Sequence, residues 1–146
     1  MSRLRDFVAR FRRRPAPVAA RSGPEIVYAP ERDGDPDPGE VVWAWVPYED
    51  DPDQGKDRPV LVIGYDGSEL LAVPLSSRDH AAKRDAAEWI EVGTGGWDGQ
   101  GRVSFAHAER VLRCRPAEVR REGAALRRDR FDAVVAGVRR FNGWIP

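Results

Sequence analysis

Apolar and polar residues alternate along the middle of the chain in short runs that end at turn residues. Residues 40–46 alternate in this way and include two tryptophans, and aromatic and β-branched residues are favoured on a pleated sheet. The runs 59–65 and 70–76 flank the dipeptide Asp66-Gly67, a spacing typical of a β-hairpin. We therefore predict that the strands 59–65 and 70–76 are antiparallel neighbours.

Polar segments separate these runs from one another. We expect a loop at 48–57, and a long loop at 77–88, where no apolar period is present, crossing the mouth of the fold. A glycine-rich turn is expected at 93–101. Three further short strands are predicted, at 89–92, 102–105 and 110–115. Several short strands at such close spacing predict a barrel.

The C-terminal part changes from strand to helix periodicity. Phe131, Val134, Val135 and Val138 recur at intervals of three and four residues, which predicts a helix over about 129–141. Pro116 is expected to begin a short helical turn before it. We interpret the apolar stripe as core packing, so the helix should cap the barrel.

The N-terminal part has a different character. Residues 1–14 place a few apolar side chains at helical spacing among arginines, and residues 15–39 are rich in proline and glycine. We therefore predict a basic N-terminal arm and linker at 1–38 and a barrel domain at 39–146. The arm is either a solvated leader or a contact for RNA, anionic lipid or a partner protein. Within the linker, residues 26–28 could lie on the body as an extended strip.

Charge is unevenly distributed although the formal net charge is zero. Residues 1–22 hold seven arginines against Asp6, a balance of +6, and the remainder of the chain therefore carries 17 basic and 23 acidic groups. Because this acidic body repels a phosphate backbone, any RNA-binding site on it must be a local basic patch.

The cysteine and histidine content bears on metal binding and on the cellular compartment. The chain of 146 residues has one cysteine, Cys114, and no cysteine or histidine pair at metal-site spacing, so we expect neither a metal nor another cofactor. A single thiol fits a reducing cytoplasm. No apolar run approaches the roughly 20 residues of a membrane span, so we predict none.

Three segments in order resemble one protein family: Gly39-Glu-Val-Val-Trp-Ala-Trp-Val-Pro47, Gln54-Gly-Lys-Asp-Arg-Pro-Val-Leu-Val-Ile63 and Leu71-Ala-Val-Pro-Leu-Ser-Ser77. They are similar to the opening of the PemK/MazF toxins, with an N-terminal arm in addition. The resemblance implies a mainly β, SH3-like, partly open barrel of the CcdB/MazF type with a C-terminal helix, arranged as a homodimer. It also implies a toxin that cleaves single-stranded RNA and is inhibited by a cognate antitoxin.

The same resemblance assigns the central catalytic role to Arg58 and matches Ser76 to the Thr or Ser that ends the third strand. A guanidinium can bind phosphate oxygens with two hydrogen bonds, and a hydroxyl can hold a phosphate oxygen. The two residues should lie close together because hairpin strands bring their ends together. The alternative for Arg58 is a surface arginine paired with Asp57 or Asp79, and the alternative for Ser76 is a hydroxyl that satisfies a turn.

Other residues are supporting candidates. Asp53 falls where many family members have an acidic loop residue, although Asp50 and Asp51 suit that description as well. His80 could carry a proton near the same mouth, or be an exposed histidine of no consequence. Ser77 is a further supporting residue, and we expect Lys56 and Arg78 to contact RNA. Of four tryptophans that could stack on bases, at most one should touch RNA: Trp43, Trp45, Trp89 and Trp97.

Two rival functions remain open. One is a catalytically inactive module of the same fold that binds RNA, DNA or a protein, including a gyrase-directed, CcdB-like role. The other is a membrane-associated scaffold held by the N-terminal arm. Retention of both Arg58 and Ser76 favours the nuclease, because the gyrase-directed branch has no need of that pair.

Overall fold

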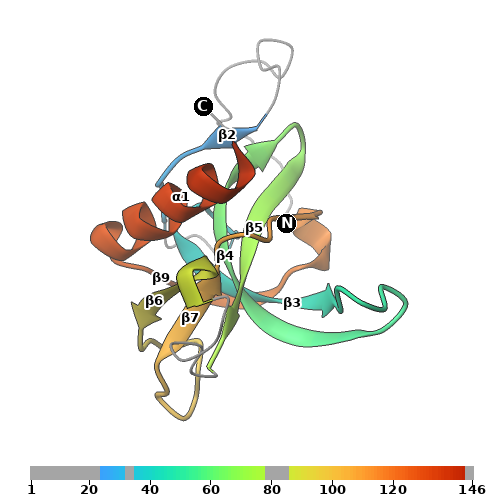
Figure 1. Cartoon of the computed structure of the whole chain (residues 1–146), viewed down its shortest axis with the longest axis horizontal. Helices are drawn as coiled ribbons and strands as arrows, with labels where there is room; N and C mark the ends of the chain where they lie inside the picture. Colours follow the sequence, from blue (N-terminus) through green and yellow to red (C-terminus); the bar gives the residue numbers. More distant parts are fainter. Residues whose placement is uncertain (1–23, 32–34, 78–85, 144–146) are drawn as a thin grey trace.

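Antiparallel strands curl into a half-open barrel that a C-terminal helix covers (Figure 1). The computed structural model describes residues 24–31, 35–77 and 86–143. The described elements in chain order are β2 (Glu25–Ile26), β3 (Glu40–Pro47), β4 (Gly55–Asp66), β5 (Glu69–Ser76), η2 (Ala86–Glu88), β6 (Trp89–Gly93), β7 (Ser104–His107), β8 (Leu112–Cys114), η3 (Pro116–Glu118), β9 (Arg120–Ala125) and α1 (Arg128–Asn142). This arrangement confirms the predicted fold class.

The predicted hairpin of β4 and β5 is the centre of the sheet. Its strands are antiparallel, with Val60 opposite Pro74, and Gly67 in its turn has the positive φ of 65° that tight hairpin turns favour. The strand order is β6-β7-β5-β4-β3-β9, with β2 paired to β4 and β8 paired to β5. The register shifts between Val62 and Gly64, and such bulges increase the twist that curls a sheet.

Alternate residues of the central strands enter two separate clusters. Leu61 and Ile63 of β4 point into the main core, which includes Phe131 and Val134 of α1. Val60 and Val62 point to the other face and join a smaller cluster with Cys114. Burial raises the pKa of this free thiol to about 11, so Cys114 stays protonated and is inert at neutral pH. The second face continues past this cluster toward the end of β5.

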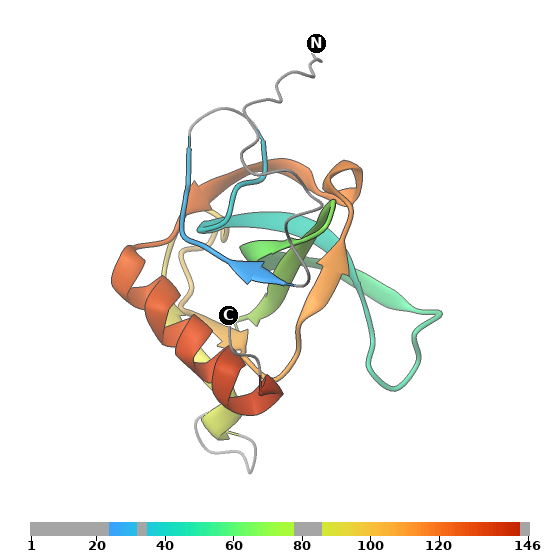
Figure 2. The same ribbon diagram turned by 90° about the horizontal axis from the view of Figure 1, so that it is seen from above.

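The helix confirms the predicted apolar stripe. α1 buries Phe131, Val134, Val135 and Val138 as expected. It ends at Gly143, which has a left-handed φ of 69° and donates its N–H to the carbonyl of Arg139. Figure 2 shows that α1 lies on the opposite side of the barrel from the projecting β3–β4 hairpin. No helix in the described ranges is long and apolar enough to cross a membrane.

An N-terminal strip lies on the barrel, as residues 26–28 were expected to be able to do. β2 pairs with β4 so closely that a Cβ on Gly64 would meet the carbonyl oxygen of Glu25 at 1.9 Å. The hydroxyl of Tyr28 donates a hydrogen bond to the carbonyl of Leu126 at 2.7 Å. Its ring packs edge-on against Phe131, with centroids 4.9 Å apart. The strip therefore ties the start of the described chain to the beginning of α1.

Two local predictions were wrong, and one strand was missed. The loop expected at 48–57 is shorter, because β4 begins at Gly55 and its first residues pair with the end of β3. The strand expected at 102–105 is β7, which lies two residues later. The strand β9 was not predicted, because its sequence RREGAA has little strand propensity and pairing with β3 forms it. The predicted arm at 1–14 and most of the loop at 77–88 lie outside the described residues.

Candidate active site

Strand register brings three polar side chains to one end of the second sheet face. Val60 of β4 is opposite Pro74 of β5, so continuing the antiparallel register by two residues sets Arg58 level with Ser76. On the other side of β5, Leu75 is opposite Ala106 and Ser76 is opposite Phe105, so His107 is level with Pro74. Because side chains alternate along a strand, Arg58, Ser76 and His107 share the same face.

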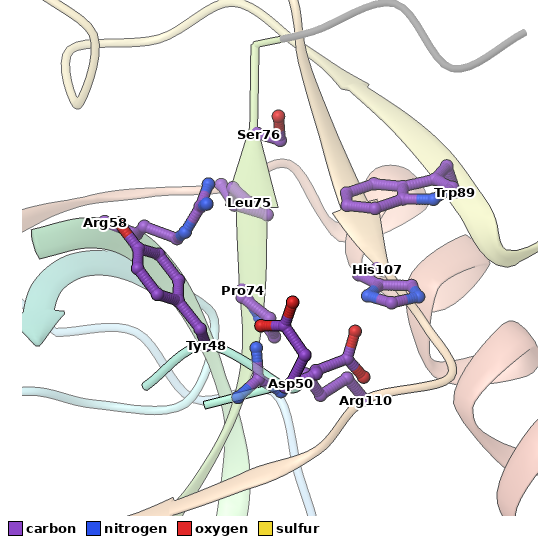
Figure 3. Close-up of a pocket in the computed structure, with 10 residues that line it drawn as sticks. Tyr48, Asp50, Arg58, Pro74, Leu75, Ser76, Trp89, His107 and Arg110 are labelled. Atoms are coloured by element: carbon purple, nitrogen blue, oxygen red, sulfur yellow. The ribbon is translucent and has the colours of Figure 1, made fainter. Parts of the chain in front are cut away.

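This face forms an open cleft of about 440 Å³. In Figure 3, Arg58 and Tyr48 lie on one side, Trp89 and His107 lie on the other, and β5 runs between them. The cleft is lined by Tyr48, Glu49, Asp50, Arg58, Pro74, Leu75, Ser76, Trp89, His107 and Arg110. Its volume and two guanidinium groups suit an anionic ligand the size of a nucleotide.

Arg58 and Ser76 occupy different environments within this cleft. Arg58 is half-buried on β4, whereas Ser76 is buried with 8% of its surface exposed at the end of β5. Arg110 follows β7 and donates a hydrogen bond to the carbonyl of Pro47, which joins this wall of the cleft to the end of β3. The lining thus combines two permanent positive charges with the hydroxyls of Ser76 and Tyr48, and it also holds the carboxyl groups of Glu49 and Asp50.

His107 is the most enclosed titratable group of the lining. It has 7% of its surface exposed, and its ring stacks on Trp89 with centroids 4.2 Å apart and planes inclined by 6°. The pairing of β6 with β7 places Trp89 directly opposite His107. Its Nε2 atom lies 3.0 Å from Oε1 of Glu88, at the end of η2. Stacking and the hydrogen bond together hold the imidazole in one orientation.

A second carboxylate completes this corner. The Oε1 atom of Glu109 lies 3.8 Å from His107 Nε2. A hydrogen bond with Glu88, followed by repulsion from its charge, raises the pKa of Glu109 above its ordinary value. The ligating atoms of Glu88, His107 and Glu109 lie within 4.8 Å of one another, a group of the types that bind metals. Glu88 hydrogen-bonds to His107, and we interpret the three side chains as a cluster of two carboxylates around one imidazole.

Several sequence candidates lie away from the cleft. Asp53 is exposed in the β3–β4 turn, Lys56 is exposed on β4, and Ser77 is exposed just after β5; none of them belongs to the described lining. The acidic residues that do line it from this hairpin are Glu49 and Asp50. Arg78 and His80 lie outside the described residues.

The tryptophans divide between core and surface. Trp97 is buried, where its indole N–H donates to Ser104 Oγ at 3.0 Å. Trp45 is 50% exposed on the projecting hairpin. Of the four tryptophans considered for base stacking, Trp89 lines the described cleft.

Sequence reasoning missed His107 and Arg110. His107 falls outside the strand predicted at 102–105, and its partners Trp89 and Glu88 are distant in sequence. One signal for His107 was available in the sequence. Side chains two residues apart on a strand share a face, so extending the predicted strand from Phe105 to residue 107 sets His107 on the same face as Phe105.

Comparison with known proteins gives one family. Residues 37–141 match the family model described as PemK-like, MazF-like toxin of type II toxin-antitoxin systems. No match was found among curated proteins.

Solved structures with the same fold carry related descriptions. A MazE–MazF structure from Deinococcus radiodurans (Form-II) has 22% identity and a TM-score of 0.53, covering 77% of this chain and 100% of that chain. A second form of it (Form-III) has 20% identity and a TM-score of 0.52, covering 75% and 98%. The Mycobacterium tuberculosis toxin MazF-mt6 has 13% identity and a TM-score of 0.50, covering 73% and 99%.

Proposed function

The chain belongs to the PemK-like, MazF-like toxin family of type II toxin-antitoxin systems, and from that premise we propose that it is an endoribonuclease that cleaves single-stranded RNA without a metal ion. The observation that carries the proposal is that Arg58 and Ser76, from neighbouring strands, line one cleft. The family model covers both residues.

The proposed chemistry asks little of the protein beyond positioning and charge. The 2′-hydroxyl of the RNA attacks the adjacent phosphorus, and the protein holds the backbone in line while negative charge develops on the phosphate oxygens. Arg58 binds these oxygens with charge-assisted hydrogen bonds, and Ser76 donates a neutral one. Arg110 lies in the same lining and adds a second cation near the backbone.

The proposed partners follow from the same family. We infer that a cognate antitoxin peptide inhibits the protein, since similar solved structures carry the description MazE–MazF. We also infer a cytoplasmic location, where the RNA substrate is present. The roles of Arg78, His80 and the basic arm stay predictions, as do those of Asp53, Lys56 and Ser77, which lie outside the described lining.

The first experiment removes the guanidinium. Purified protein is incubated with a long single-stranded RNA in excess chelator, and the cut sites and their end groups are mapped. Arg58→Ala should slow cleavage by about 10² to 10³, the usual effect of losing one contact to a developing oxyanion. Arg113→Ala is the matched control, because Arg113 pairs with Asp66 on the surface and does not line the cleft. Equal activity of both variants would contradict the role of Arg58.

The two neighbouring hydroxyls are compared next. Ser76→Ala should slow cleavage by a smaller factor than Arg58→Ala. Ser77→Ala tests the supporting role predicted for Ser77, which is exposed and lies outside the described lining, so its effect should be smaller than that of Ser76→Ala. The products should carry a 2′,3′-cyclic phosphate, or the 3′-phosphate formed from it. An RNA with a 2′-deoxy sugar at the cut position should resist cleavage; efficient cutting of that substrate would refute this mechanism.

One observation favours a second candidate, an inactive binding module of the same fold. Glu49 and Asp50 line the same cleft, and their charges oppose a phosphate backbone. The first experiment separates the two functions: RNA left intact by wild-type protein indicates the binding module, whose ligand is RNA if the intact RNA is bound and another molecule if it is not.

A further inference from the structure

His107 is the one imidazole among the described side chains that line the cleft. Arginine stays protonated, serine and tyrosine ionise only at high pH, and a carboxyl group is ordinarily ionised at neutral pH with no proton to give, whereas an imidazole exchanges a proton between about pH 5 and 8. His107 lines the cleft and is enclosed by Trp89 and Glu88. In an RNA cleavage reaction, such a group has a specific use.

The contact with Glu88 decides which ring nitrogen is available. A carboxylate accepts hydrogen bonds, so Nε2 of His107 carries a hydrogen toward Glu88 at 3.0 Å. Among the described residues, no hydrogen bond occupies the other ring nitrogen, Nδ1. When the ring is protonated, Nδ1 therefore has a proton to give to a molecule in the cleft.

The register sets the distance between this proton and the phosphate-binding pair. Ser76 is opposite Phe105, two residues before His107 on the neighbouring strand. Diagonal neighbours on one face of an antiparallel pair lie about 7–8 Å apart. A phosphate held by Arg58 and Ser76 can thus reach toward the imidazole through its 5′-bridging oxygen.

We propose that His107 is the general acid that protonates the 5′-oxygen leaving group, an inference that rests on the proposed ribonuclease function. The bond from the 2′-oxygen to phosphorus forms as the bond from phosphorus to the 5′-oxygen breaks. The 2′-hydroxyl proton passes to water in the open cleft, and the Nδ1 proton of His107 passes to the departing 5′-oxygen. The products are a 2′,3′-cyclic phosphate and a 5′-hydroxyl, and water reprotonates the ring.

The test replaces the 5′-oxygen at a mapped cut site with sulfur. A thiolate leaves without a proton, since thiols are far more acidic than alcohols, so this substrate has no need of a general acid. His107→Gln should cut ordinary RNA about 10² to 10⁴ times more slowly than wild type, the usual contribution of a positioned acid. It should cut the sulfur substrate at nearly the wild-type rate. Arg58→Ala should remain slow on both substrates, because its proposed role precedes departure of the leaving group.

His107→Phe is a second variant that keeps an aromatic ring against Trp89 if the glutamine variant folds poorly. Unchanged cleavage of ordinary RNA by either folded variant would overturn the assignment, and so would an equal loss on both substrates. If wild-type protein cuts neither substrate, the proposed ribonuclease function fails and takes this inference with it. If wild-type protein cuts ordinary RNA but the sulfur substrate does not restore cleavage by His107→Gln, the ribonuclease function stands and only the role of His107 fails.

Discussion

Glu109 carries a negative charge that the neighbouring Glu88 carboxylate repels. A hydrogen bond with Glu88 and, after it, repulsion by the Glu88 charge raise the pKa of Glu109. A carboxyl with a raised folded-state pKa contributes stability at low pH, where it is protonated, and loses that contribution as the pH rises through the folded-state pKa. At neutral pH, the ionised Glu109 therefore disfavours the folded state.

Glu109→Gln should accordingly raise the melting temperature at neutral pH by a small amount, about 1–2 °C. The difference should vanish below the ordinary pKa of 4.5, where wild-type Glu109 is neutral. Melting curves across this pH range measure it.

Glu118 is the matched control, because both glutamate side chains are 51% exposed. Hydrogen bonds from the backbone and side chain of Arg115 lower the pKa of Glu118. The ionised Glu118 therefore stabilises the folded protein above its ordinary pKa, and this contribution is lost as the pH falls through the lowered pKa. Glu118→Gln should lower the melting temperature at neutral pH and have no effect in acid. Shifts of the same sign in the two variants would contradict this account.

Among single residues, the sequence predicted those site residues that lie in short local motifs. Arg58 and Ser76 could be singled out because each lies in a recognisable short motif, and the pairing of β4 with β5 brings them together. His107 could not, since its position depends on the pairing of β6 with β7 and on Glu88, 19 residues earlier. Arg110 likewise contacts Pro47, 63 residues away.

At the scale of the elements, the two-residue strand β2 depends on its close approach to Gly64 of β4. Gly64 leaves room for the carbonyl of Glu25, so Gly64→Ala should displace β2 while leaving the core of β4 in place. We expect it to lower stability by about 1–3 kcal/mol, the usual range for overpacking. Gly99→Ala is a control, because a Cβ there meets no atom within 4 Å. Equal melting temperatures for the two variants would contradict the close approach of β2.

Truncation addresses the predicted domain boundary. A chain that begins at Pro24 keeps Tyr28 and its hydrogen bond to Leu126, and should melt like the whole protein. One that begins at Pro36 loses β2 and Tyr28, and should melt cooperatively at a lower temperature. An unfolded chain from Pro36 would show that residues before it belong to the core.

Element prediction succeeded where periodicity was strong. The runs of β4 and β5 are continuously apolar over most of their length, and the apolar stripe of α1 keeps one helical repeat, so their burial could be predicted. Strand β9 has arginine, glutamate, glycine and alanine, and only its pairing with Glu40 and Val41 makes it a strand. Such pairing joins distant segments and leaves no local signature.

For the whole molecule, we propose a homodimer formed outside the cleft, as the family resemblance implies. Sedimentation of the full chain at micromolar concentration should give twice the monomer mass. Arg58→Ala should not change this mass, because Arg58 lies in the cleft. A strict monomer would refute the proposed homodimer but would leave the description of the fold unchanged.

The hydrogen bond from Tyr28 to Leu126 also has a consequence for synthesis. It joins residues 98 positions apart, and a ribosome adding about 5–20 residues per second needs about 5–20 s to supply the second after the first. During that interval, β3 lacks its partner β9, and the N-terminal strip has no helix to dock on. Under the proposed ribonuclease function, the fold is complete only after β9, Leu126 and α1 have been made, so the ribosome that makes the chain and the message being read are spared until then.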